Sequence, residues 1–185
     1  MLLVAFFFVC FGLCASEWEV HTLKPYQDNN KTYNRTLRAL RTNDTLRLLQ
    51  YSEFLEKKVD HCLVSVFLNR TLDGARRTLE TASIGNHTQS KRNVIIHLRN
   101  EVPYPYIEVF AEKGELEYRW SERKDVLFGS TRCFILEAQP VIKVKRPVCV
   151  VWGFENQSSE CFKKSEKLCE KIKNVTLGDC QQFKK

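Results

Sequence analysis

Cysteines carry the clearest chemistry in this chain of 185 residues. Eight are present, and two of them, Cys10 and Cys14, fall in an apolar N-terminal segment. The other six are Cys62, Cys133, Cys149, Cys161, Cys169 and Cys180. Thiols at this density in an exported chain are usually oxidised in pairs, so we expect a disulfide framework. The cysteine count alone leaves the pairing open.

The sequence contains no comparably clear motif for catalysis or for metal binding. The four histidines lack the paired spacing of a zinc site, and His61 adjoins a cysteine that we expect to be oxidised and therefore not nucleophilic. The chain contains neither a Gly-x-Ser-x-Gly nucleophile motif nor a phosphate-binding glycine loop. We therefore predict no enzyme activity, no catalytic residue, no metal and no cofactor.

The N-terminus has the pattern of a secretion signal. Residues Leu2–Val9 are apolar and the small residues Cys14, Ala15 and Ser16 follow soon after. The apolar run is well short of the roughly 20 residues that cross a bilayer. We therefore expect residues 1–16 to be a cleaved signal peptide, and residues 17–185 to form one secreted, extracellular domain without a membrane anchor.

Asparagine sequons agree with export. Seven Asn-x-Ser/Thr tripeptides occur, which makes glycosylation expected at several of them and places them on the surface. They begin at Asn30, Asn34, Asn43, Asn69, Asn86, Asn156 and Asn174.

The formal net charge is +7, but the basic residues are spread along the chain. No compact basic run alternates with aromatic residues, so we predict no nucleic-acid partner. The simplest interpretation is a solvated surface on a monomer. The alternative is attraction to an anionic partner, whether acidic lipids, glycosaminoglycans or a host protein.

Short apolar or alternating segments separated by polar turns dominate the rest of the chain, and they predict strands. We expect them at residues 45–51, 62–68, 77–82, 93–98, 106–111, 116–121, 132–137 and 148–154. A short helix is expected within residues 30–40 and an amphipathic helix over residues 159–173. Eight evenly spaced strands favour an all-β antiparallel barrel around a cavity.

Two motifs carry a family resemblance: Cys133-Phe134-Ile135, and Cys149-Val150-Val151-Trp152 followed by the remaining C-terminal cysteines. Together they resemble the tick salivary lipocalins, which include the histamine-binding proteins. The resemblance implies an eight-stranded antiparallel lipocalin barrel with a short N-terminal helix and a disulfide-tethered C-terminal helix, secreted in saliva. It also implies the disulfides Cys62–Cys180, Cys133–Cys161 and Cys149–Cys169.

Strand alternation then predicts which side chains face the cavity. If Cys133 and Cys149 face outward, the opposite face carries Phe134, Leu136, Val150 and Trp152. Further cavity candidates on alternating strands are Tyr118 and Trp120, and Tyr106, Glu108 and Phe110. Each aromatic residue is equally explained by ordinary core packing.

The residue types at the candidate cavity positions indicate which class of ligand to expect. Amine-binding members of the family have acidic residues where this chain has Phe134 and Val150, so histamine or serotonin is disfavoured unless Glu108 faces inward. We expect instead an amphipathic lipid, such as a fatty acid or eicosanoid, captured from the host. The alternative is a barrel whose outer loops inhibit a host plasma protein of complement or haemostasis.

Overall fold

The computed structural model describes residues 28–59, 62–81, 90–116, 120–139, 145–156, 158–176 and 180. The expected signal peptide lies outside these residues. The described part contains two helices, α1 (Asn29–Arg41) and α2 (Ser159–Leu168), and a 3₁₀ turn, η1 (Glu53–Leu55). Its ten strands are β1 (Leu46–Ser52), β2 (Val64–Ser65), β3 (Phe67–Arg70), β4 (Gly74–Glu80), β5 (Lys91–Arg99), β6 (Tyr106–Ala111), β7 (Lys124–Gly129), β8 (Cys133–Gln139), β9 (Val148–Gly153) and β10 (Ile172–Asn174).

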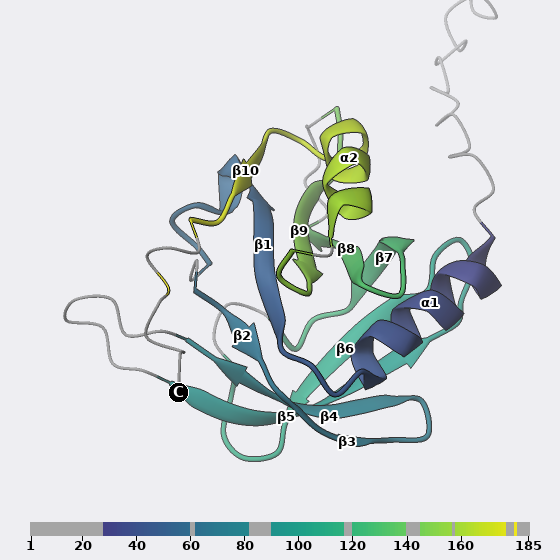
Figure 1. The fold of residues 1–185 in the computed structure, drawn as a ribbon, viewed down its shortest axis with the longest axis vertical. Helices are drawn as coiled ribbons and strands as arrows, with labels where there is room; N and C mark the ends of the chain where they lie inside the picture. The colour runs from purple at the N-terminus through teal and green to yellow at the C-terminus, as the bar shows by residue number, and fades with distance from the viewer. Residues whose placement is uncertain are drawn as a thin grey trace, which may run out of the picture.

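The strands form a closed antiparallel barrel, as predicted (Figure 1). Eight strands run in the order β1-β2-β4-β5-β6-β7-β8-β9, and pairing of β9 with β1 closes the ring. Strand β3 continues the course of β2 after Val66 and pairs with β4, while β10 pairs with the second half of β1. Closure satisfies the hydrogen-bonding edge that an open sheet would expose.

Alternation along β8 and β9 separates two buried clusters. Phe134 and Trp152 belong to the large cluster inside the barrel. Ile135 and Val151, one residue away on the same strands, belong to a second cluster outside it, together with the cysteines of both strands. Because consecutive strand residues point to opposite faces, this is the arrangement that the sequence pattern predicted.

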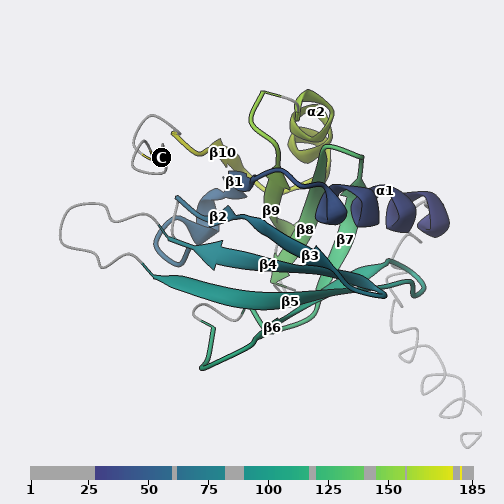
Figure 2. The ribbon, with the colours of Figure 1, turned by 60° about the horizontal axis from the view of Figure 1, so that its bottom comes forward.

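Helix α1 covers one end of the barrel (Figure 2). It begins at Asp28, whose side chain accepts a hydrogen bond from the Lys31 amide at 3.0 Å. Near the start, Asn29 donates to the Glu101 carbonyl in the β5–β6 turn, and at the end Arg41 donates to the Gly74 carbonyl at the β3–β4 turn. Because both turns lie at the same end, α1 crosses that end from one side to the other.

Helix α2 lies against the outside of β7, β8 and β9 (Figure 1). Two disulfides attach it, Cys133–Cys161 from β8 and Cys149–Cys169 from β9. The third, Cys62–Cys180, links the β1–β2 connection to the end of the chain. All three pairs are those that the family resemblance implied. Neither helix of the described residues is long and apolar enough to cross a membrane.

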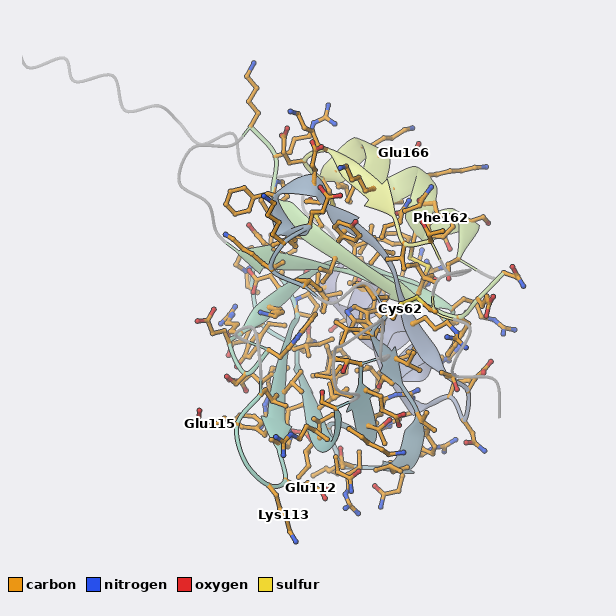
Figure 3. The ribbon with its side chains drawn as sticks, turned by 90° about the vertical axis from the view of Figure 1, so that its left-hand side faces the viewer. Cys62, Glu112, Lys113, Glu115, Phe162 and Glu166 are labelled. Atoms are coloured by element: carbon orange, nitrogen blue, oxygen red, sulfur yellow. A yellow bond between two sulfur atoms is a disulfide. The ribbon has the colours of Figure 1, made fainter. Side chains whose placement is uncertain are left out.

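The sequence misplaced one strand and the end of one helix. No strand forms at Leu116 or at 120–121, the described part of the strand predicted over 116–121; the strand is β7 instead, which begins at Lys124. The predicted turn at Lys113-Gly114 is present, with Gly114 at φ 73°, and Lys113 points away from the barrel at its tip (Figure 3). The helix predicted over 159–173 ends at Leu168, because the chain then extends into β10.

Candidate ligand-binding cavity

The interior of the barrel holds a cavity that strands from the whole ring and α1 line together. Its wall is almost entirely apolar, as expected for a small-molecule site. The lining residues are Leu40, Leu46, Ser65, Thr78, Leu79, Val94, Ile96, Ile107, Val109, Trp120, Lys124, Phe134, Leu136 and Trp152. No carboxylate is among these described residues, so none of them offers a counter-charge to a protonated amine.

The cavity is narrow, with a volume of about 50 Å³. One water needs roughly 10–15 Å³ of such space, so the cavity has room for a few waters and not for a lipid. Binding of a lipid-sized ligand therefore requires side chains of the wall to move apart.

Two tryptophans and a lysine lie at one side of this cavity. The rings of Trp120 and Trp152 meet edge to face, with centroids 5.9 Å apart. The ammonium of Lys124 lies 5.8 Å from the centroid of the Trp120 ring. Lys124 is only 1% exposed, although lysine is among the residue types least often buried.

A second buried cation, Arg77 on β4, fastens α1 to the barrel wall. Its guanidinium donates to the carbonyls of Leu40, Thr42, Asp44 and Ser65 and to the Ser65 hydroxyl, at 2.6–3.2 Å. Burial lowers the pKa of Arg77 to about 10, so the side chain remains charged at neutral pH. The five bonds use all five N–H donors of an arginine, which makes Arg77 a structural group.

The predicted cavity residues fall into three groups. The structure brings Phe134, Leu136, Trp152 and Trp120 together in the cavity wall. Val150 is fully buried in the same interior cluster but does not line the open space. Tyr118 lies outside the described residues.

The predictions on β6 were wrong. Ile107 and Val109 line the cavity from this strand, so the alternating residues Tyr106, Glu108 and Phe110 face outward. Phe110 is 47% exposed, and its ring meets that of His97 edge to face on the outer surface. Glu108 therefore cannot serve as an inward-facing partner of an amine.

Sequence reasoning missed Lys124. A lysine at the start of a strand ordinarily faces solvent, and the strand was predicted several residues earlier. Its pairing with Ile107 on β6 is what turns it inward, because Ile107 is itself a lining residue. Only the register between β6 and β7 gives this information, and the sequence pattern does not contain it.

The described sequon asparagines all lie on the surface. Asn30 and Asn34 are exposed on α1, and the others that the structure describes are Asn43, Asn69, Asn156 and Asn174. Asn86 lies outside the described residues. The surface positions are compatible with the predicted glycans.

Among the described residues, no group of three or more His, Cys, Asp or Glu side chains is placed to hold a metal ion. A cluster of charged side chains lies on the outer face of the barrel. There the Asp73 carboxylate accepts a hydrogen bond from His97 at 2.8 Å and forms an ion pair with Arg99. Asp73, His97 and Arg99 are not among the residues that line the barrel cavity, and their contacts are those of a surface ion-pair network.

No protein family's sequence profile matches the chain, and no curated protein sequence matches it either. A solved structure does. Japanin from Rhipicephalus appendiculatus, bound to cholesterol, superposes with a TM-score of 0.52 over 74% of this chain and 94% of its own, at 18% sequence identity. The likeness, together with the closed eight-stranded ring, shows that the chain has the lipocalin fold.

Proposed function

We propose that this protein is a secreted lipocalin of tick saliva that captures a small host mediator inside its barrel. The favoured ligand is an amphipathic lipid such as a fatty acid or eicosanoid. The observation that carries the proposal is the apolar wall of the cavity, to which Phe134 contributes. In the amine-binding members of the family that the sequence resembles, an acidic residue takes the place of Phe134.

The charges of the wall argue against histamine and serotonin. An ammonium moved from water into an apolar cavity loses its hydration, and the loss is recovered only where a carboxylate or several acceptors replace it. The described lining residues include no carboxylate. A cationic ligand would therefore find no counter-charge among them.

The solved neighbour supports a lipid. Japanin was crystallised with cholesterol, so a barrel of this fold accommodates an extended apolar molecule. Secretion is supported by the N-terminal signal pattern and by the three disulfides, which persist in oxidising compartments.

A titration tests the proposal directly. The glycosylated, disulfide-intact protein is titrated with arachidonate, leukotriene B4, cholesterol, histamine and serotonin, followed by tryptophan fluorescence and by calorimetry. Because Trp120 and Trp152 both line the cavity, a bound ligand changes their emission. Stoichiometric binding of a lipid with no amine response supports the proposal, whereas amine binding alone contradicts it.

The narrow cavity supports a second candidate function, inhibition of a host plasma protein through the outer loops. A barrel filled by its own side chains serves as a scaffold without a ligand. Failure of every lipid and amine to bind, together with capture of a complement or haemostasis component by the intact protein, would favour this function over the first.

A further inference from the structure

We propose that Asn34 carries an N-linked glycan whose first sugars lie in a groove between α1 and β3. Seven sequons leave open which asparagines are modified. Two independent observations single out Asn34: a threonine hydroxyl in its sequon that the fold does not use, and a groove that its own side chain lines. The inference depends on secretion, which is part of the proposed function, and not on the ligand of the barrel.

The first observation is the hydroxyl of Thr36, the last residue of the sequon Asn34-Arg35-Thr36. Thr36 is fully buried where α1 packs on β7, and its hydroxyl has no hydrogen-bond partner among the described residues. A threonine inside a helix usually points to solvent or bonds to a carbonyl one turn earlier, and an unpaired buried hydroxyl destabilises the folded state. The fold alone therefore favours valine here, whereas the glycosylation pattern requires serine or threonine.

Two other sequons differ from each other in the same respect. The Thr71 hydroxyl, in the sequon of Asn69, is also buried without a partner among the described residues. The Ser158 hydroxyl, in the sequon of Asn156, donates to the Phe154 carbonyl at 2.9 Å, so the fold explains it. Burial of a sequon hydroxyl does not prevent modification, because the glycan is attached to the chain before the chain has folded.

The second observation is the groove beside Asn34, where α1 lies next to β3 (Figure 2). Its volume is about 650 Å³, far larger than that of the cavity inside the barrel. Its walls include Asn34, Leu37, Arg38 and Arg41 from α1, and Phe67 and Arg70 from β3. The four α1 residues are spaced three or four apart, so they follow one another along the helix. A glycan on Asn34 therefore starts at one end of the groove and continues along it.

The groove offers the groups that bind a neutral sugar. Leu37 and Phe67 provide apolar surface for the C–H face of a sugar ring. Arg38 and Arg70 are exposed at the rim, and guanidinium N–H groups donate to the hydroxyl and acetamide oxygens of a sugar. A glycan seated there would connect α1, which covers one end of the barrel, to the barrel wall.

The first test is mass spectrometry of the protein secreted from insect or mammalian cells, which should find glycans on Asn34 and Asn69. Thr36→Val should abolish the modification of Asn34, and Thr36→Ser, which keeps the sequon, should retain it. In an Asn34→Gln background no glycan is present at this site in either case. There Thr36→Val should leave the melting temperature unchanged or raise it by about 2–4 °C, because it removes the unpaired hydroxyl.

The matched control is Ser158→Ala in an Asn156→Gln background. This change removes a buried hydroxyl that has a partner, so it should lower the melting temperature by about 2–4 °C. If Thr36→Val does not fold, the occupancy of Asn34 in the wild type and in Thr36→Ser still tests the inference.

The second test measures the release of glycans from the folded protein by an N-glycosidase. A seated glycan must first leave the groove, so release at Asn34 should be about 10-fold slower than at Asn69, the protection expected from one hydrogen bond to a charged group. The side chain of Asn69 does not line the groove. Arg38→Ala should accelerate release at Asn34 alone, and release from the denatured protein should be equal at both sites.

The outcomes separate this inference from the proposed function. An unmodified Asn34 in a protein glycosylated elsewhere, or a loss of stability on Thr36→Val in the Asn34→Gln background, would overturn the inference and leave lipid capture standing. Equal release at Asn34 and Asn69 from the folded protein would overturn the placement in the groove. Retention of a protein with unmodified Asn34 on heparin, lost in Arg38→Ala, would assign the groove to a sulfated polyanion instead. Absence of glycans from the whole secreted chain would overturn the inference together with the predicted glycosylation.

Discussion

Replacing Arg77 with methionine is expected to lower the free energy of unfolding by about 3–5 kcal/mol, the range for removing one partner of a buried charged network. Two of the acceptors that lose their donor, the carbonyls of Leu40 and Ser65, belong to fully buried bonds. Each buried acceptor left unsatisfied costs about 1–3 kcal/mol. The hydrogen bonds to the carbonyls of Thr42 and Asp44 are only part-buried, so water can replace some of the hydrogen bonding that these carbonyls lose.

The assay is urea unfolding of the disulfide-intact protein, followed by far-ultraviolet circular dichroism. The control is Arg76→Met, one residue earlier on the same strand. Arg76 faces outward and pairs with Glu112 at the surface, so its loss should cost no more than about 1 kcal/mol. Arg77→Lys should fall between the two, because an ammonium has three donors and no planar fork.

The Arg77 reasoning fails if Arg77→Met is no less stable than Arg76→Met. That result would mean that α1 and the β1–β2 region hold their positions without the guanidinium. A large loss of stability in Arg77→Met with no loss in Arg77→Lys would instead assign the effect to the charge alone and contradict the argument from five directed bonds.

Three further effects are expected. Removing the Cys62–Cys180 disulfide, whose cysteines are 118 residues apart, should cost about 5 kcal/mol, against about 3 kcal/mol for Cys149–Cys169 at 20 residues; urea midpoints of the double alanine variants check this order. Gly129→Ala should cost roughly 1–3 kcal/mol, measured as a lower melting temperature, because its Cβ would come within 2.2 Å of a side-chain atom of α1. Burial raises the pKa of Asp73, but its hydrogen bond with His97 and nearby positive charges outweigh this and lower the pKa below its ordinary value. Its stabilising contribution is therefore present above about pH 4 and lost as the pH falls further, so Asp73→Asn should show a flatter loss of stability there than the wild type.

The interior and exterior faces of β8 and β9 could be predicted from the sequence because they depend on alternation alone. Once Cys133 and Cys149 face α2, Phe134 and Trp152 must face the cavity, and the structure places them there. The disulfide pairing could not be predicted from the residues alone, since the number of cysteines does not determine which of them pair. The family resemblance supplied the three pairs that the structure contains.

The face of β6 could not be predicted in the same way. Tyr106, Glu108 and Phe110 alternate with Ile107 and Val109, and both sets are largely apolar. Hydrophobic alternation therefore did not distinguish the two faces. No covalent link fixes the strand as the cysteines fix β8 and β9, so the choice depends on pairing with β5 and β7.

The sign of the charge inside the cavity depends on the same unpredictable register. The net charge of +7 says nothing about it, because a net charge does not tell which charged side chains face inward. Had β7 paired with β6 one residue out of register, Lys124 would face solvent and Asp125 would face the cavity. Such a barrel would hold a carboxylate and favour an amine. One pairing, that of Ile107 with Lys124, therefore decides which charged side chain lines the cavity, and no pattern in the sequence gives that pairing.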